Sequence, residues 1–452
     1  MHVVLISTYE LGHQPFGLAS PTAWLRRAGA NVTCLDTAVQ HLDRAAVAAA
    51  ALIGVYVPMH TATRLAADLL PELRALAPAA TIVCYGLYAP LNAAFLRTRG
   101  ADHCIGGEFE AELTAIYTAL AQNDPPAEAE SRPIILDRLA FIPPDRQGLP
   151  GLHAYANLIT ADGPRNAGYT ETSRGCKHRC RHCPIVPVYN GHFRIVSRET
   201  VLEDVRRQVA AGAQHITFGD PDFLNGPGHV MPIVRALHAE HPELTYDVTI
   251  KVEHLLRHAD LLAELRTTGC ILITSAIEAL DDGILERLEK HHTRADVARA
   301  AQLLREHDIA LNATFVAFTP WTSRQIYRAF LHGIAEIDLI DHVAPIQYAI
   351  RLLIPAGSRL LELPETQALV KPFDQQSLAF PWDHPDPAMD RLQRMAIRLA
   401  QGSGPRNETR RQFFTGLLEL VEAQIGGPLP PIDSRHLIAR PPIPLMSEPW
   451  YC

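Results

Sequence analysis

Three cysteines stand close together in the segment RGCKHRCRHCPI, residues 174–185. Cys176, Cys180 and Cys183 are three of the eight cysteines in a chain of 452 residues, and they are separated by three and then two residues. Thiolates at this spacing can bind three irons of a four-iron cluster, because cysteine sulfurs are the ligands of such clusters. The fourth iron would remain open to another molecule. Basic residues in the segment favour the thiolate form of the cysteines: Arg174, Lys177, Arg179 and Arg181.

A zinc site is an alternative for the same segment. His178 and His182 lie between the cysteines, and zinc accepts both thiolates and imidazoles. The spacing of three and then two residues is unusual for zinc modules and therefore favours iron. Cysteines that only pack and bind no metal are a third interpretation.

The first part of the chain alternates short apolar runs with amphipathic segments. The apolar runs, read as buried strands, are residues 2–7, 31–36, 52–57, 81–86 and 103–107. Five such units predict a flavodoxin-like, doubly wound parallel sheet over residues 1–125. Residues 126–165 are rich in proline and charge, and we interpret them as a linker.

A second series of strands and helices follows the linker. Its expected strands are residues 168–174, 215–220, 244–250, 270–278, 310–318 and 343–354. They predict a partial (β/α)6 barrel over residues 166–360, followed by a small, mostly helical region and tail over residues 361–452. The three cysteines follow the first barrel strand, so we expect them at the carboxyl-terminal mouth, where active sites of such barrels lie.

The segment CKHRCRHC resembles the CxxxCxxC signature of radical S-adenosylmethionine (SAM) enzymes, and the similarity extends over about residues 166–360. The resemblance implies that Cys176, Cys180 and Cys183 bind a [4Fe-4S] cluster. It also implies that the open iron binds SAM, which is cleaved to a 5'-deoxyadenosyl radical. His182 takes the place of an aromatic residue near the adenine.

Three further segments carry the same resemblance. In FGDPDF, residues 218–223, Asp220 or Asp222 would accept a hydrogen bond from the SAM ammonium. SAIEALDDGILERLEKHHT, residues 275–293, contains Glu278, and IRLLIPAGSRL, residues 350–360, contains Arg351. The resemblance implies that both residues face the cofactor. A buried ion pair that closes the barrel is the alternative for them.

The first domain resembles the cobalamin-binding domain of cobalamin-dependent radical SAM enzymes, through residues 15–36 and GGEFEAEL, residues 106–113. The absence of an Asp-x-His-x-x-Gly motif implies cobalamin without a histidine below the cobalt. The same absence fits a domain that has lost cobalamin. Candidate contacts at the expected strand ends are Ser7, Thr8, Gly17, Gly86, Gly106 and Glu108.

The carboxyl terminus, SEPWYC, resembles the tail of the CUAEP/CCAEP-tail radical SAM proteins, which is the family most like this chain. Leu445 and Met446 occupy the paired cysteine or selenocysteine positions. Cys452 is the thiol that remains, and it is a candidate catalytic residue that accepts an electron or a hydrogen atom, or else binds a metal. A disordered terminus without a role is the alternative.

Composition limits the possible partners. The formal net charge is -8, which is untypical of general nucleic-acid binders, so no nucleic-acid partner is expected. The chain has no signal-like amino terminus and no apolar stretch near the roughly 20 residues that span a membrane. We therefore predict a cytoplasmic protein without a membrane partner.

The resemblance implies a methyltransferase that uses a [4Fe-4S] cluster, SAM and cobalamin on an unactivated centre of a small molecule. A low-potential donor such as flavodoxin or ferredoxin would supply electrons. One alternative is a radical SAM enzyme with a cobalamin-free first domain. A protein that binds metal or cobalamin without catalysis is another.

Overall fold

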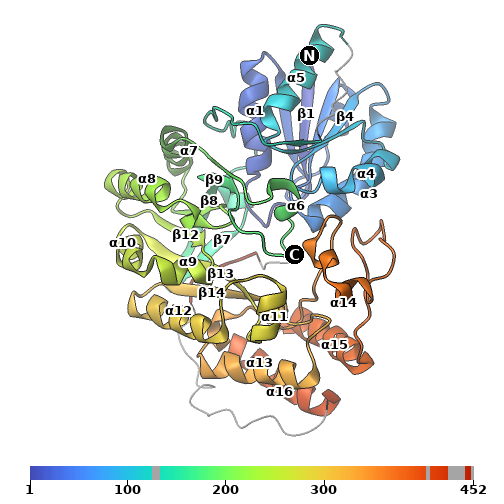
Figure 1. Ribbon diagram of the computed structural model, residues 1–452. Coiled ribbons are helices and arrows are strands. Elements are labelled where there is room, and N and C mark those ends of the chain that lie inside the picture. Colours follow the sequence, from blue (N-terminus) through green and yellow to red (C-terminus); the bar gives the residue numbers. More distant parts are fainter. Residues whose placement is uncertain (125–132, 404–407, 426–442, 449–452) are drawn as a thin grey trace.

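The computed structural model describes residues 1–124, 133–403, 408–425 and 443–448. They form two α/β units, with a helical region against the second unit (Figure 1). The expected tail residue Cys452 lies outside the described residues.

The first unit contains a parallel sheet in the order β2-β1-β3-β4-β5-β6. Its strands are β1 (His2–Ser7), β2 (Asn31–Asp36), β3 (Leu52–Tyr56), β4 (Thr81–Tyr85), β5 (His103–Gly107) and β6 (Ile134–Ile135). Its helices are α1 (Phe16–Arg27), α2 (Arg44–Ala48), α3 (His60–Leu76), α4 (Ala93–Thr98) and α5 (Glu110–Ala121). The order reverses between β1 and β3, as in a flavodoxin-like sheet, so the predicted fold class is confirmed.

Alternate residues of β1 show why this sheet needs helices on both faces. Val4 packs in one apolar cluster with Leu70 of α3, whereas Leu5 packs in another with Leu18 of α1. Residues 3–7 of β1 are therefore all buried, as expected for a parallel sheet covered on both sides.

The second unit contains a sheet in the order β14-β13-β12-β11-β8-β7-β15. Its parallel strands are β8 (Gly163–Thr170), β11 (His215–Phe218), β12 (Thr245–Thr249), β13 (Cys270–Glu278) and β14 (Ala310–Phe315). The antiparallel strands β7 (Asn157–Thr160) and β15 (Leu445–Met446) extend one edge. The helices around this partial barrel are α7 (Arg198–Ala210), α8 (Pro227–Glu240), α9 (Val252–Arg257), α10 (Leu262–Thr267), α11 (Asp282–Arg287), α12 (Arg294–Glu306) and α13 (Arg324–Glu336).

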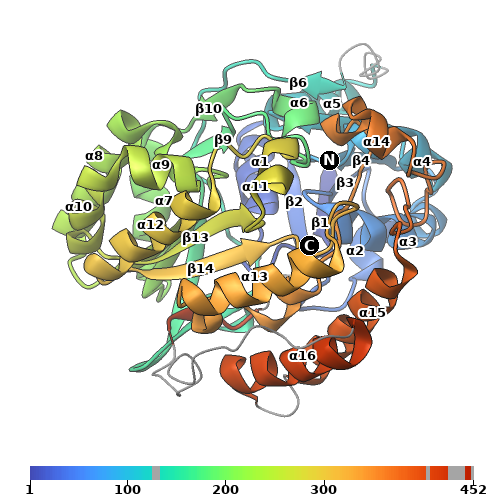
Figure 2. The ribbon, with the colours of Figure 1, turned by 60° about the horizontal axis from the view of Figure 1, so that its bottom comes forward.

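The expected sixth strand, residues 343–354, is wrong as a strand. Pro345–Tyr348 forms a 3-10 helix, and only Arg351 pairs with the barrel, in a single bridge to Phe318. Helices α15 (Pro387–Ser403) and α16 (Arg410–Ile425) lie along this side of the barrel, beside α13 (Figure 2). Phe413 and Phe414 of α16 contact the ring of Tyr348, so the segment is buried by helix packing instead of strand pairing.

The expected first barrel strand, residues 168–174, is divided. Strand β8 ends at Thr170, and Ser173–Gly175 forms a separate strand β9 that pairs antiparallel with β10 (Phe193–Ile195). The cysteine segment therefore starts from a short hairpin at the end of β8.

Candidate functional site

The three cysteines lie on one loop that neighbouring segments hold in place. Cys176 and Cys180 are buried, and Cys183 is half-buried. The loop is anchored on its far side, where the amide of Arg181 donates to the carbonyl of Leu288 at 3.0 Å. Ser358 Oγ donates to the carbonyl of Arg181 at 3.2 Å.

A glycine starts this loop because no other residue fits there. Gly175 has φ of +75°, and a Cβ atom would lie 2.4 Å from the ring of Tyr189 and 2.5 Å from the carbonyl of His192. The close approach of these residues to the backbone sets the direction in which Cys176 leaves β9.

Two of these thiols are costly to ionise without a metal, because their pKa values are raised. Burial raises the pKa of Cys176, and burial together with Cys180 raises the pKa of Cys183 to about 12. Metal ligation offsets this cost because it stabilises the thiolate. Three cysteines on one loop, two of them buried and one half-buried, therefore fit a cluster with three cysteine ligands.

Lys290 is a buried cation that interacts electrostatically with Cys180 and Cys183. It was not among the residues expected at the site. Burial would lower the pKa of Lys290, but Glu278, Cys180 and Cys183 outweigh burial and raise it. The signal was present, because Lys290 lies in the same segment 275–293 as Glu278. Arg174, expected to support the cysteines, instead binds carboxylates of the first unit.

The structure brings two of the expected site residues together beside the cysteine loop. His182 Nε2 lies 3.0 Å from Glu278 Oε1, and Lys290 Nζ lies 3.4 Å from the same oxygen. Burial would raise the pKa of Glu278, but Lys290 and His182 hold it at about 2. Glu278 therefore stays charged at neutral pH.

Arg351 does not take part in this group. Its Nη1 lies 2.6 Å from Asp390 Oδ1 in α15, and its guanidinium lies 3.5 Å from the centre of the Trp382 ring. It joins the barrel to the helical region, and the alternative in which it pairs with Glu278 is wrong.

The two candidate aspartates have different surroundings. Asp220 accepts hydrogen bonds from the Thr172 amide at 2.9 Å and from the hydroxyls of Thr172 and Ser173, each at 2.5 Å. Its oxygens are thus used to hold the turn before β9.

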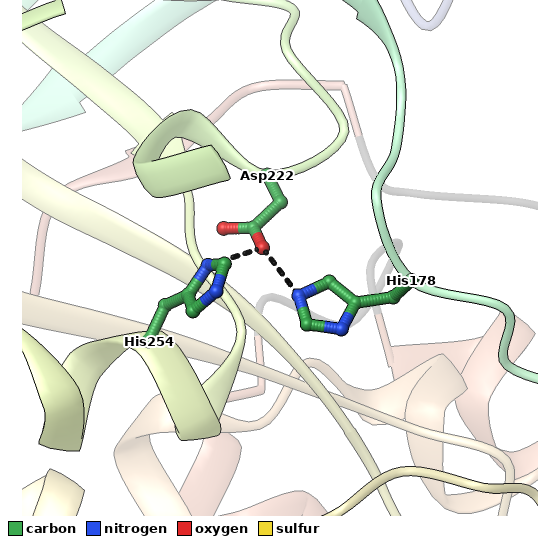
Figure 3. Close-up of side chains that lie close together, drawn as sticks. All are labelled: His178, Asp222 and His254. Atoms are coloured by element: carbon green, nitrogen blue, oxygen red, sulfur yellow. Dashed lines mark ion pairs between the residues drawn. The ribbon is translucent and has the colours of Figure 1, made fainter. Parts of the chain in front are cut away.

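Asp222 faces the cysteine loop, where it meets two imidazoles (Figure 3). Its Oδ2 lies 2.7 Å from His254 Nδ1 and 3.4 Å from His178 Nε2. Burial would raise the pKa of Asp222, but the contacts with His178 and His254 outweigh it and lower the pKa. The role of either aspartate toward SAM stays a prediction.

The candidate cobalamin contacts lie at one edge of the first sheet, and all are buried: Ser7, Thr8, Gly17, Gly86, Gly106 and Glu108. One ring of the chain itself lies against two of these glycines. A Cβ on Gly17 would lie 2.1 Å from the Tyr56 ring, and one on Gly86 would lie 3.0 Å from it. The Tyr56 ring therefore fills the space directly beside these two glycines.

Glu108 belongs to a buried ion network between the two units. Arg174 Nη1 lies 3.3 Å from Glu108 Oε2, and Arg174 Nη2 lies 2.6 Å from Glu110 Oε1. Tyr189 also donates to Glu108, at 3.1 Å. The network explains the burial of Glu108 without a cofactor, and its predicted role in cobalamin binding stays a prediction.

Part of the chain is similar to a described protein family and to curated proteins. Residues 170–329 match the family described as the Radical SAM superfamily. The chain is 26% identical over 183 residues to a ribosomal protein uS12 methylthiotransferase of Geobacter sulfurreducens, which covers 38% of this chain and 40% of that protein. It is 25% identical over 174 residues to hopanoid C-3 methylase of Methylococcus capsulatus, over 38% of this chain and 33% of that protein.

Two solved structures share the fold over most of the chain. The radical SAM methyltransferase TsrM from Kitasatospora setae matches with a TM-score of 0.63 and 18% identity, over 82% of this chain and 77% of TsrM. The cobalamin-dependent radical SAM enzyme OxsB matches with a TM-score of 0.65 and 14% identity, over 89% of this chain and 67% of OxsB.

These findings identify a radical SAM domain in residues 170–329, and such a domain implies a [4Fe-4S] cluster and SAM. The chain matches only 40% to 51% of the length of the first three curated relatives. Some relatives modify tRNA or a ribosomal protein by name, so the absence of a nucleic-acid partner stays a prediction. Among the described helices, none has the length and apolar character needed to cross a membrane.

Proposed function

We propose that this chain is a radical SAM enzyme in which Cys176, Cys180 and Cys183 hold the [4Fe-4S] cluster. The observation that carries the proposal is the gathering of three cysteines, two buried and one half-buried, on one loop at the mouth of a parallel barrel. When bound, the cluster supplies the electron that cleaves SAM to a 5'-deoxyadenosyl radical. The hydrogen bonds at Arg181 fix the loop that carries the cysteines.

Residues beside the loop supply charge to this site. Lys290 places a buried cation near Cys180 and Cys183, which favours their thiolates. Glu278 fixes Lys290 and His182, and its low pKa keeps it anionic over the working range of pH. His182 is then oriented for the adenine side of SAM.

Methylation of an unactivated carbon or phosphorus centre in a small molecule is the reaction class that we propose. The fold shared with the methyltransferase TsrM supports it. The presence of cobalamin in the OxsB structure supports cobalamin as a second cofactor in the first domain. A low-potential donor such as flavodoxin or ferredoxin would supply the electrons.

A cobalamin-free first domain is the second candidate, and one observation favours it. The Tyr56 ring occupies the space directly beside Gly17 and Gly86, two of the residues expected to contact cobalamin. In this form the first domain supports the barrel through Arg174, and the radical acts directly on the substrate.

We also propose membership of the CUAEP/CCAEP-tail family. Its support is the resemblance of SEPWYC, residues 447–452, to the tail of that family. In the structure Leu445–Met446 pairs with β7, and Tyr9 of the first unit donates to Glu448 at 3.0 Å. The described end of the tail thus contacts both units. The catalytic role of Cys452 stays a prediction.

Anaerobic reconstitution with iron and sulfide, followed by an assay for 5'-deoxyadenosine, tests the cluster assignment. We expect about four irons per chain, as one [4Fe-4S] cluster requires, together with SAM cleavage. The triple variant Cys176→Ala, Cys180→Ala, Cys183→Ala should lose both. Cys270→Ala, a buried cysteine at the start of β13, is the matched control and should keep both. Undiminished nucleoside in the triple variant would contradict the assignment.

Incubation of the anaerobic protein with hydroxocobalamin, followed by gel filtration and a visible spectrum, separates the two candidates. Stoichiometric retention supports the cobalamin-dependent form. Retention of cobalamin only by the Tyr56→Ala variant supports a first domain in which the Tyr56 ring blocks the cobalamin site. No retention by either protein supports the cobalamin-free candidate.

A further inference from the structure

Three side chains of types that bind metals meet beside the three cysteines, and none of them is a thiol. His178 comes from the loop itself, Asp222 follows β11, and His254 lies in α9, after β12. One nitrogen or oxygen atom from each lies within 4.8 Å of the other two (Figure 3). Three elements of the barrel therefore converge on one point.

The converging atoms are buried and lack hydrogen-bond partners among the described residues. The side chains are 13%, 0% and 5% exposed for His178, Asp222 and His254. His178 Nε2, Asp222 Oδ2 and His254 Nδ1 make no hydrogen bond of acceptable geometry, although two of the contacts are short. Buried polar atoms without partners are rare because their desolvation is costly, so these three need an explanation.

A shared cation explains the arrangement better than direct pairing. Lone pairs that point at a common ion do not point at one another, which accounts for short distances without hydrogen-bond geometry. Ligand atoms about 2.0 to 2.2 Å from one ion lie roughly 3 to 3.5 Å apart. The distance of 3.4 Å between His178 and Asp222 falls in that range, and the 2.7 Å between Asp222 and His254 needs a small increase.

The donor set indicates the kind of ion. Two imidazoles and one carboxylate, with further positions open, form the set that Zn²⁺ or Fe²⁺ accepts. Glu253 supplies a second carboxylate, whose Oε2 lies 3.7 Å from His178 Nδ1, on the other side of that imidazole. A carboxylate behind a ligating histidine orients the ring and is common at metal sites.

We propose that His178, Asp222 and His254 bind one divalent transition-metal ion, separate from the three cysteines. The ion would clamp the cysteine loop to the ends of β11 and β12. Asp222 would be a ligand of this ion and would not accept from SAM. This site does not depend on the proposed function, because none of its ligands is a thiol.

The test uses the full chain with Cys176, Cys180 and Cys183 all changed to Ala, so that thiols cannot bind the metal. The protein is freed of metal and titrated with Zn²⁺ by equilibrium dialysis, and Co²⁺ absorption reports the ligand type. We expect one Zn²⁺ per chain and a Co²⁺ spectrum without sulfur charge-transfer bands. Asp222→Asn and His254→Gln should each weaken binding by at least 10-fold, as loss of one ligand requires.

His258→Gln is the matched control, because His258 lies on the same side of the barrel but outside the three-residue group. It should bind Zn²⁺ as the parent does. Circular dichroism checks that each variant is folded, and the nearly isosteric Asp222→Asn decides the matter if His254→Gln is unfolded. Absence of stoichiometric Zn²⁺ in the parent, or equal affinity in Asp222→Asn, would overturn the proposal. Loss of SAM cleavage in the triple variant is a separate result and tests only the cluster.

Discussion

Arg174 of the barrel and Glu110 of the first unit form a buried ion pair, with 2.6 Å between Nη2 and Oε1. The Arg174 side chain is only 8% exposed, and it also lies 2.7 Å from Glu171 Oε2. One guanidinium thus binds carboxylates from both units. It lies between the edge of the first sheet and the cysteine loop, which follows Arg174 in the chain. This ion pair is one of several contacts that join the barrel to the first unit.

We predict that Arg174→Gln strongly destabilises the protein. The change leaves Glu108 and Glu110 buried without a cation, and breaking such a pair costs about 3 to 5 kcal/mol. Urea unfolding followed by circular dichroism measures the loss. Arg206→Gln breaks an exposed pair with Glu240 and is the control, with a far smaller expected effect. Equal unfolding midpoints for the two variants would contradict the role of Arg174.

Glu171 predicts a pH dependence of stability. Burial raises its pKa to about 7 in spite of Arg174, compared with an ordinary value of 4.5. The folded state therefore binds a proton more tightly than the unfolded state, so this group's contribution is complete below pH 4.5 and is lost as the pH rises through 7. The contribution is up to about 3 kcal/mol.

Thermal unfolding between pH 5 and 8 measures this effect. We expect the melting temperature to fall with rising pH in the parent. In Glu171→Gln the fall should be smaller, since the amide does not titrate. A parallel pH profile in the variant would show that another group is responsible.

The first sheet could be predicted from sequence because its strands are short apolar runs at regular spacing. The apolar run at residues 343–354 misled the same reasoning. Tyr348 and Leu352 are as buried as strand residues, yet Pro345 cannot donate to a strand ladder, and α16 covers the segment. Periodicity reports burial, and it does not distinguish a strand from a buried 3-10 helix.

The candidate site could be predicted only in part, because the sequence shows local spacing and does not show contacts between distant residues. The cysteine spacing is local, so the loop was evident from the sequence. His254 meets Asp222, and Arg174 meets Glu108, only after the barrel and both units assemble. These partners are separated by 32 and 66 residues, and no local pattern connects them. Gly17 could not be interpreted from sequence either, because only the folded structure shows that the Tyr56 ring lies where a larger side chain would be.

Asp220 predicts a link between the turn before β9 and the cluster. Asp220→Ala removes the acceptor for the Thr172 amide and for two buried hydroxyls, at a cost of about 3 kcal/mol. The cysteine loop should then bind less iron after reconstitution. Asp220→Asn keeps one acceptor oxygen and should lie between the parent and the alanine variant. Full iron content in Asp220→Ala would separate the turn from the cluster.

Glu278 and Lys290 form a buried ion pair beside the cysteines, and changing it tests whether the protein and its cluster need these two charges. The pKa of Glu278 is about 2, so its contribution to stability is present above the ordinary value of 4.5 and is lost as the pH falls toward 2.

Glu278→Gln leaves Lys290 buried without its anion and should destabilise the protein by about 3 kcal/mol at neutral pH. The double variant Glu278→Gln, Lys290→Met removes both charges and should recover much of that loss, because a neutral pair carries no unpaired charge. Its iron content should still be lower than the parent's, since Lys290 no longer offsets the thiolates of Cys180 and Cys183. Iron retained in full by the double variant would show that the cluster does not need this cation.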